Sequence, residues 1–243
     1  MNELKHYPIF YEDELTTLYL GDCAEIFPQL GLVDAVVTDP PYGIKENDRK
    51  QKSREQLAKP TEYGIFNWDD KPPERWLLDM FRSRSKQQII FGGNFFELPP
   101  ASCYLVWDKD NSGDFADCEL AWTNIKKAIR KLKYRWNGMI QENMTNKEVR
   151  LHPTQKPVAV MEWCLSHLEQ PQVIVDPYAG SGSTLIAARR LGIRNIGIEF
   201  DERYCQIIAD TLNGNIARWI KGGATKPESQ HITESPLFAS NRE

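Results

Sequence analysis

The sequence lacks any apolar run close to the roughly 18 residues that suggest a membrane-spanning helix. Residues 1–10 contain no basic start followed by an apolar core, so we expect no signal peptide. The five cysteines include no pair at CxxC spacing, and their odd number argues against a disulfide framework. This usage fits a reducing compartment, and we expect a cytoplasmic protein that does not associate with a membrane.

Histidine pairs and a large net charge are also missing. The four histidines form no HxxxH or HExxH pair, so the sequence predicts no metal site. The formal net charge is −4, which by itself argues mildly against a nucleic acid partner. Residues 126–136 depart from this average because they combine basic and aromatic side chains with no acid. A charge run alone is typical of a solvated helix face, so its meaning depends on its place in the chain.

Short apolar runs predict the strands of a parallel sheet that is buried on both faces. These runs cover residues 15–20, 33–38, 88–91, 104–107, 118–123, 173–175 and 195–198. Helical patterns cover residues 75–83, 157–168, 184–191 and 201–220. Thr154 is a candidate cap for the helix that starts at Pro157. Strands that alternate with helices predict a doubly wound α/β sheet, and the chain length suits one domain.

Two stretches fall outside this pattern. Residues 44–73 are polar and of mixed charge, and we expect a long mobile loop there. Residues 221–243 are expected to form a disordered tail. Residues 1–220 are therefore expected to contain the whole folded domain.

A small-residue turn follows the predicted strand at 173–175. A Walker phosphate loop needs a lysine after Gly182, where Ser183 stands, and a dinucleotide fingerprint needs glycine or alanine at Leu185. A turn that approaches a nucleoside or zwitterionic ligand remains, although a lone GxG is more often only structural. Glu199 ends the next strand, where a carboxylate can accept hydrogen bonds from ribose hydroxyls, and Phe200 beside it can pack on an adenine ring.

A second turn, Asp39-Pro40-Pro41-Tyr42, follows the strand at 33–38. Proline fixes φ and holds the preceding residue extended, so the Asp39 carboxylate and the Pro40 carbonyl become rigid acceptors. Two such acceptors suit the exocyclic amino group of adenine or cytosine, because they stabilise positive charge that develops on its nitrogen. Tyr42 can stack on the base, an interaction worth about 1–3 kcal/mol. A proline-stiffened loop without a catalytic role is the alternative.

These two turns together resemble the amino-methyltransferases of DNA. Their order, with the Asp-Pro-Pro-Tyr turn first and the glycine-rich turn last, is similar to the circularly permuted β class. Residues 152–157, His-Pro-Thr-Gln-Lys-Pro, resemble a stretch that precedes the cofactor strand in that class, and 91–95 and Gly21-Asp22 also match. The resemblance covers about residues 15–220. It implies a Rossmann-like methyltransferase sheet whose termini lie between the helix at 201–220 and the strand at 15–20.

The resemblance implies S-adenosylmethionine as cofactor and a set of residues for each role. The catalytic residues would be Asp39, Pro40, Pro41 and Tyr42. The cofactor-binding residues would be Asp22 near the adenine, Thr154 and Lys156 near the methionine end, the turn Asp176, Tyr178, Ala179, Gly180, Ser181, Gly182, Ser183 and Thr184, and also Asp39, Glu199 and Phe200.

In the β class the target-recognition region lies where this chain has residues 124–151, so the basic segment becomes a candidate for contact with double-stranded DNA. The predicted DNA-binding residues are Lys126, Lys127, Arg130, Lys131, Lys133, Arg135 and Trp136. The region is short for the class. The loop at 44–73 carries Lys50, Lys52 and Arg54 and is expected to close over DNA.

We therefore predict an enzyme that methylates the N6 amino group of adenine in DNA. The class usually has Asp at the first motif position for adenine and Ser for cytosine, so Asp39 favours adenine and leaves N4-cytosine as the first alternative. RNA, a protein amide, and a DNA-binding subunit without catalysis are further alternatives. Several enzymes of the class are dimers, so a homodimer is also open.

Overall fold

The computed structural model describes residues 7–44, 71–111, 116–137, 140–152 and 154–215. Most of the loop predicted at 44–73 lies outside the described residues, and so does the whole tail predicted at 221–243. The helix predicted at 201–220 ends at Leu212, earlier than predicted, and residues 216–220 lie outside the described residues.

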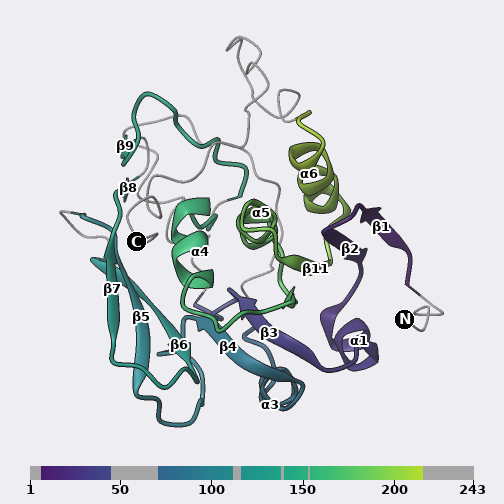
Figure 1. The fold of residues 1–243 in the computed structure, drawn as a ribbon, viewed down its shortest axis with the longest axis horizontal. Coiled ribbons are helices and arrows are strands. Elements are labelled where there is room, and N and C mark those ends of the chain that lie inside the picture. Colours follow the sequence, from purple (N-terminus) through teal and green to yellow (C-terminus); the bar gives the residue numbers. More distant parts are fainter. Residues whose placement is uncertain (1–6, 45–70, 112–115, 138–139, 153, 216–243) are drawn as a thin grey trace.

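A nine-stranded sheet forms the centre of the fold (Figure 1). Its strands, in spatial order, are β1 (Ile9–Glu12), β2 (Thr16–Leu20), β11 (Arg194–Glu199), β10 (Val173–Asp176), β3 (Val33–Thr38), β4 (Ser85–Phe91), β6 (Cys118–Thr123), β5 (Cys103–Asp108) and β7 (Arg130–Lys133). The strands from β2 to β4 are parallel to their neighbours. Their carboxyl ends therefore meet at one edge of the sheet, where open α/β sheets bind ligands.

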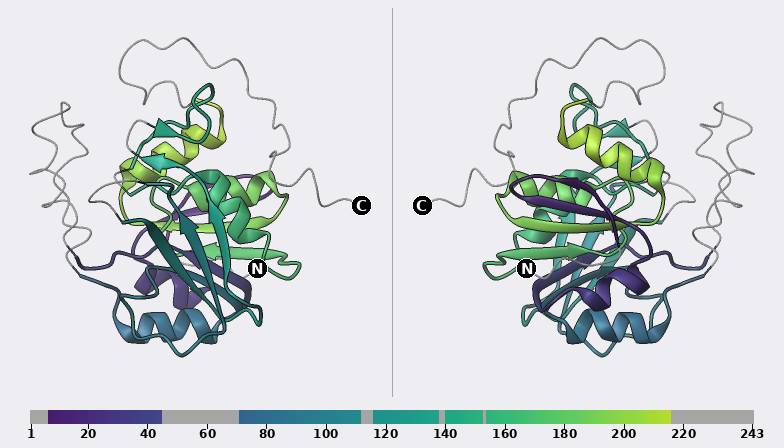
Figure 2. Two further views of the ribbon diagram at one scale, coloured as in Figure 1. Left: turned by 90° about the vertical axis from the view of Figure 1, so that its left-hand side faces the viewer. Right: turned by 90° about the vertical axis from the view of Figure 1, so that its right-hand side faces the viewer.

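Helices cover both faces of this sheet, which makes it a mixed, doubly wound α/β fold (Figures 1 and 2). The helices are α1 (Cys23–Ile26), the short 3-10 helix η1 (Phe27–Gln29), α3 (Arg75–Ser83), α4 (Val158–Leu165), α5 (Ser183–Arg190) and α6 (Glu202–Leu212). One core packs α1 and α3 against the sheet, and a second core packs α4 and α5 against its other face. A third cluster joins α6 to β2.

The central strands are apolar at successive positions because both of their faces are covered. In β3, Val36 packs with α1 and α3, whereas Ala35 and Val37 pack with α4 and α5. All three side chains are fully buried. This two-sided burial explains why the strand appears in the sequence as a continuous apolar run.

Three further details of the fold differ from the sequence predictions. The basic segment contains the edge strand β7, paired with β5, and no helix. Helix α4 ends at Leu165, earlier than predicted, and its N-cap residue is Pro157. Thr154 does not cap it, because the Glu148 carboxylate accepts the hydrogen bond from the Val158 amide at 3.0 Å. Strand β1 and helix α1 were not predicted at all.

Residues 124–151 add only a little regular structure to the sheet. After β7, the strands β8 (Trp136–Asn137) and β9 (Ile140–Gln141) form a two-stranded antiparallel pair. Among the helices that the structure describes, none is both long and apolar enough to cross a membrane.

Candidate active site

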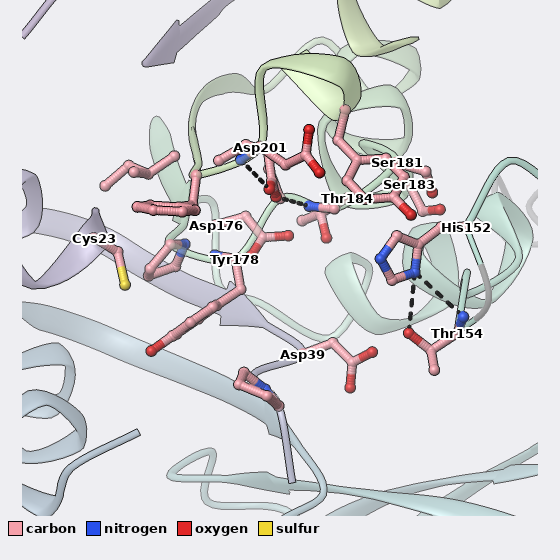
Figure 3. A pocket seen from close by; sticks show the side chains of 18 of the residues that line it. Cys23, Asp39, His152, Thr154, Asp176, Tyr178, Ser181, Ser183, Thr184 and Asp201 are labelled. Atoms are coloured by element: carbon pink, nitrogen blue, oxygen red, sulfur yellow. Dashed lines mark hydrogen bonds between the residues drawn. The ribbon is translucent and has the colours of Figure 1, made fainter. Parts of the chain in front are cut away.

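A cavity of about 690 Å³ opens at the carboxyl edge of the parallel strands (Figure 3). Asp22, Asp39, Asp176 and Glu199, the acids that follow or end β2, β3, β10 and β11, all line it. Neighbouring parallel strands place these four acids side by side although they lie far apart in the sequence. The loop at 154–156 closes another side.

The glycine-rich turn joins β10 to α5 and requires glycine at Gly182. This residue adopts φ +83°, and a Cβ atom there would lie 2.8 Å from Ile208 Cγ1 of α6. Its amide donates to the Ala179 carbonyl at 2.8 Å, which closes the turn just before Ser183 starts the helix. A side chain at this position would strain the backbone and push α6 away, so the conformation is available only to glycine.

Glu199 holds this turn from the neighbouring strand. One carboxylate oxygen accepts from the Gly180 amide at 2.7 Å, and the other accepts from the Asp201 amide at 2.9 Å. Burial nevertheless raises the pKa of Glu199 to about 7. Each oxygen keeps a second lone pair, so the carboxylate can accept further hydrogen bonds from a ligand in the cavity.

Asp176 lies deeper, at the end of β10. The Thr38 hydroxyl donates to its Oδ1 at 2.8 Å, and the Tyr178 amide donates to the same atom at 3.1 Å. Burial raises the pKa of Asp176 to about 7, against the effect of these hydrogen bonds. Asp176 therefore ties the end of β3 to the start of the glycine-rich turn.

Asp39 is the centre of a charged network. The Tyr42 hydroxyl donates to Asp39 Oδ1 at 2.6 Å, and the Lys156 ammonium pairs with Asp39 Oδ2. Lys156 Nζ also lies 3.1 Å from Glu119 Oε2, and its side chain is only 6% exposed. Burial raises the pKa of the Asp39 carboxyl, and Lys156 opposes that effect.

Tyr42 is held in place by the segment 91–95. A Cβ atom on Gly92 would lie 2.2 Å from Tyr42 Cε1, so only glycine leaves room for the ring. The Phe95 ring stacks on Tyr42 at 4.9 Å between ring centroids, with 16° between the planes. The match at 91–95 thus has a physical reason, which is to accommodate the tyrosine of the Asp-Pro-Pro-Tyr turn.

The loop at 152–156 is fixed from both ends. The Thr154 amide and hydroxyl approach His152 Nδ1 at 3.2 and 3.1 Å, and the His152 ring packs on Tyr204 of α6 with centroids 4.5 Å apart. At the other end, the Ser183 hydroxyl donates to the Lys156 carbonyl at 2.7 Å. These bonds direct the Lys156 side chain between Asp39 and Glu119.

Comparison with known proteins decides the family. A family model described as DNA methylase matches residues 106–210. YubD of Escherichia coli K12, which is named as a methylase, is 50% identical over 216 residues, covering 76% of this chain and 84% of that protein. The chain belongs to the DNA methylase family. Type II methyltransferase M.ScaI of Streptomyces caespitosus is 25% identical over 270 residues, covering 84% of this chain and 83% of that protein.

Solved structures show the same fold as this methylase. The M1.HpyAVI–SAM complex matches with a TM-score of 0.51 at 23% identity, over 81% of this chain and all of that one. The PvuII DNA methyltransferase, which is cytosine-N4-specific, matches with a TM-score of 0.52 at 16% identity, over 87% of this chain and 94% of that one. The predicted Rossmann-like methyltransferase fold is confirmed.

Most residues predicted for the site of this methylase line the cavity. The predicted residues in its lining are Asp22, Asp39, Pro41, Thr154, Lys156, Asp176, Tyr178, Ala179, Gly180, Ser181, Ser183, Thr184, Glu199 and Phe200. Gly182, Pro40 and Tyr42 are not in the lining: Gly182 shapes the turn, and the Tyr42 hydroxyl donates to Asp39. Sequence reasoning missed His152 and Tyr204 as site residues, although His152 begins the His-Pro-Thr-Gln-Lys-Pro stretch and Tyr204 lies one helical turn beyond Phe200.

The predicted DNA-binding residues lie in β7 and in the segments just before and after it. Lys133 and Arg135 lie toward its carboxyl end, at the cavity edge of the sheet, and both pair with Asp110. Lys131 pairs with Asp108. Lys126, Lys127 and Arg130 lie at the opposite edge, where Lys127 Nζ donates to the His167 carbonyl at 3.2 Å. Trp136 is 8% exposed and packs in the core, so its ring is not available to a ligand in this conformation.

Among the described residues, no group of three or more His, Cys, Asp or Glu side chains could hold a metal ion. Two acids of the cavity already accept hydrogen bonds, Asp176 from the Thr38 hydroxyl and Glu199 from the Gly180 amide. The site combines a cleft lined by carboxylates with an aromatic ring, Tyr42, that is hydrogen-bonded to one of them, Asp39. Such a cleft can hold a nucleoside, and Asp39 can accept hydrogen bonds from an amino group at the cleft's edge.

Proposed function

We propose that the chain transfers a methyl group from S-adenosylmethionine to the N6 amino group of adenine in DNA. The observation that carries this proposal is the position of Asp39. Its carboxylate lines the same cavity as the glycine-rich turn and Glu199, with Tyr42 hydrogen-bonded to it. An amino-group acceptor and a nucleoside cleft thus adjoin each other.

The residues of the cavity fit S-adenosylmethionine. Glu199 is a buried acceptor for ribose hydroxyls, and Phe200 is 77% exposed beside it, which leaves its ring free to cover an adenine. Asp22 at the end of β2 can accept from the adenine amino group, and Thr154 and the free amides of the α5 N-terminus can bind the methionine end. When bound, S-adenosylmethionine supplies an electrophilic methyl group on sulfur.

The chain's own part in the reaction is to prepare the amino group. Its nitrogen lone pair is delocalised into the base and is a poor nucleophile. When the Asp39 carboxylate and the Pro40 carbonyl accept hydrogen bonds from its two N–H groups, the lone pair becomes free for attack and the developing positive charge is stabilised. Tyr42 provides an aromatic face for a base that has left the duplex.

Adenine is favoured over cytosine because the family's motif usually begins with Asp for adenine, and Asp39 stands there. Methylation at N4 of cytosine is the second candidate, because the fold is shared with the cytosine-N4-specific PvuII enzyme. RNA and protein amides contain similar nitrogens and are weaker candidates, because the family model that matches this chain is described as DNA methylase.

The sheet topology supports the proposed circular permutation. Strand β2, near the start of the chain, pairs in parallel with β11, near its end, and α6 follows β11 and packs on β2. We place DNA along the carboxyl edge of the sheet, because Lys131, Lys133 and Arg135 lie toward the carboxyl end of β7 at that edge. DNA contact by Lys126, Lys127 and Arg130, at the other edge, stays a separate prediction.

Base identity can be tested with methyl-labelled S-adenosylmethionine and unmethylated genomic DNA, followed by digestion to nucleosides. The proposal predicts label in N6-methyladenine. Label in N4-methylcytosine would support the second candidate. No label in DNA, with S-adenosylmethionine binding intact by calorimetry, would redirect the search to RNA and protein. If the protein neither labels DNA nor binds S-adenosylmethionine, it would be a DNA-binding subunit without catalysis.

A further inference from the structure

Four charged side chains form a row of alternating sign that begins at Asp39. Asp39 pairs with Lys156, Lys156 lies 3.1 Å from Glu119, and Glu119 pairs with Lys109. Lys109 Nζ also lies over the Trp107 ring, 5.0 Å from its centroid. Glu119 belongs to β6, outside every motif that the sequence displays, and it does not line the cavity.

Asp39 cannot bind an amino group strongly while Lys156 neutralises it. Its Oδ2 is paired with the ammonium and its Oδ1 accepts from Tyr42. A carboxylate that shares its charge with an ammonium is a weaker acceptor for a new donor. The contact between Asp39 and Lys156 must therefore lengthen when a base enters.

Lengthening this contact is unfavourable unless the ammonium keeps another partner. The Lys156 side chain is 6% exposed and lies over the Phe91 ring, 5.2 Å from its centroid. A buried charge that loses its only counter-ion is strongly destabilised. Glu119 is the second counter-ion, and Lys109 on its far side holds the Glu119 carboxylate in position.

We propose that Glu119 is a positioning residue for methyl transfer, which keeps the Lys156 ammonium paired while Asp39 turns to the amino group of the base. Glu119 acts through Lys156 and touches neither base nor cofactor. The inference rests on the proposed function. It adds a role for β6 to a site that otherwise consists of turns at strand ends.

The charges that face Asp39 agree with this role. Lys156 lowers the pKa of the Asp39 carboxyl, whereas burial and Glu119 raise it. Tyr42 faces it through a hydrogen bond, and Asp176 is a further acid close enough to interact with it. Lys156 and Lys109 hold the pKa of Glu119 below its usual range although burial would raise it, so the two ammonium groups favour the ionised form of Glu119.

The test compares Glu119→Gln with Lys156→Met in single-turnover methyl transfer to DNA across pH. Asp39 must be ionised to act, so the acid limb of the rate reports its pKa. Loss of the negative charge in E119Q should lower that pKa and shift the limb to lower pH by about one unit, with a plateau rate about tenfold lower. K156M should shift the acid limb to higher pH. A purely structural defect would leave the acid limb of either variant at its wild-type pH.

A second readout does not depend on activity. Carbon NMR of labelled aspartate, with D39N used to assign the signal, follows Asp39 titration directly, and it should show the same two opposite shifts. Asp117→Asn is the matched control, since it removes an exposed acid two residues away without touching Lys156 and should change neither profile. Glu119→Asp should restore part of the wild-type profile.

An E119Q profile and Asp39 titration that match wild type would overturn the inference, even if the rate fell. The Asp39 titration could shift in opposite directions in E119Q and K156M while wild type transfers no methyl group to DNA. In that case the pairing of Lys156 with both Asp39 and Glu119 is upheld, and the proposed function fails. The two failures are therefore distinguishable.

Discussion

Gly92 illustrates how one residue position serves the site without contacting a ligand. Its φ of +69° favours glycine, and the Tyr42 ring occupies the space that a side chain would need. Gly192 has a nearly identical φ of +70° but has no atom within 4 Å of the position that its Cβ would take. Substitutions at the two glycines therefore allow the cost of backbone strain, which both positions have, to be distinguished from the cost of displacing Tyr42, which only Gly92 has.

Gly92→Ala should therefore abolish most methyl transfer, whereas Gly192→Ala should not. Backbone strain should cost each variant about 1–2 kcal/mol of unfolding free energy, because an L residue then occupies the left-handed region. G92A should lose more, because its Cβ also clashes with the Tyr42 ring. Only G92A should displace Tyr42 from Asp39. Denaturant unfolding and methyl-transfer rates of the two variants check this, and equal activity of both variants would show that the position of Tyr42 does not matter.

Glu199 should make S-adenosylmethionine binding depend on pH. Its pKa of about 7 means that it is partly protonated in the free protein near neutrality. Hydrogen bonds from ribose hydroxyls favour the ionised form, so binding should lower its pKa and release a proton. Affinity should therefore fall as the pH drops below about 7.

Calorimetry near pH 6.5, in two buffers of different ionisation enthalpy, measures this proton release directly. Glu199→Gln should bind S-adenosylmethionine more weakly and release fewer protons. The proton release that remains should come from Asp176, whose pKa is also about 7. Glu97→Gln, at an exposed position on the surface, is the control and should behave as wild type. Binding enthalpy that is independent of the buffer in wild type would contradict the role given to Glu199.

At the scale of elements, the buried strands could be predicted from sequence and the edge strand could not. Strand β3 was predicted with its observed bounds because both of its faces are apolar. Strand β7 has the sequence Arg-Lys-Leu-Lys and is mostly exposed, so its conformation depends on pairing with β5, which local sequence does not reveal.

The same limit applies to the site. Asp39 and Glu199 could be predicted because each follows or ends an apolar run, and a motif surrounds each of them. Glu119 could not, because its partner Lys156 is 37 positions away along the chain and only the sheet brings the two side chains together. Neither its charge nor its spacing distinguishes it in the sequence from other acids of the chain.

Strand β7 should contribute to DNA affinity through phosphates. Replacing Lys131 and Lys133 by Ala should weaken binding equally for all sequences and reduce the slope of log affinity against log salt by about 0.9 for each phosphate that is no longer neutralised. The pairs with Asp108 and Asp110 must open for these lysines to reach DNA. Fluorescence anisotropy at several salt concentrations measures the slope.

Replacing Lys126 and Lys127, at the other edge of the sheet, is the matched comparison. If DNA follows the cavity edge, this pair should change the slope less than Lys131 and Lys133 do. Equal effects would extend the interface from β7 to the segment that precedes it, and no effect of either pair would make the basic segment a solvated surface.

At the scale of the whole molecule, the order of strands in space differs from their order in the chain. The proposed permutation predicts that the start of the chain can be moved. A variant that begins at Pro171, in the exposed turn after α4, with the original ends joined by a flexible linker, keeps every strand pair of the sheet. It should unfold cooperatively and bind S-adenosylmethionine; loss of the fold would contradict the permutation.

The central claim is that Asp39 activates an adenine amino group at the edge of the cofactor cavity, whose cofactor-binding residues lie mainly in the glycine-rich turn and at Glu199. Asp39→Ala and wild type should be compared for label transferred to N6-methyladenine in DNA and, in the same preparations, for S-adenosylmethionine affinity by calorimetry. The account predicts that D39A loses methyl transfer by at least about a hundredfold while cofactor affinity changes little. Substantial label in adenine from D39A, or joint loss of transfer and cofactor binding, would contradict it.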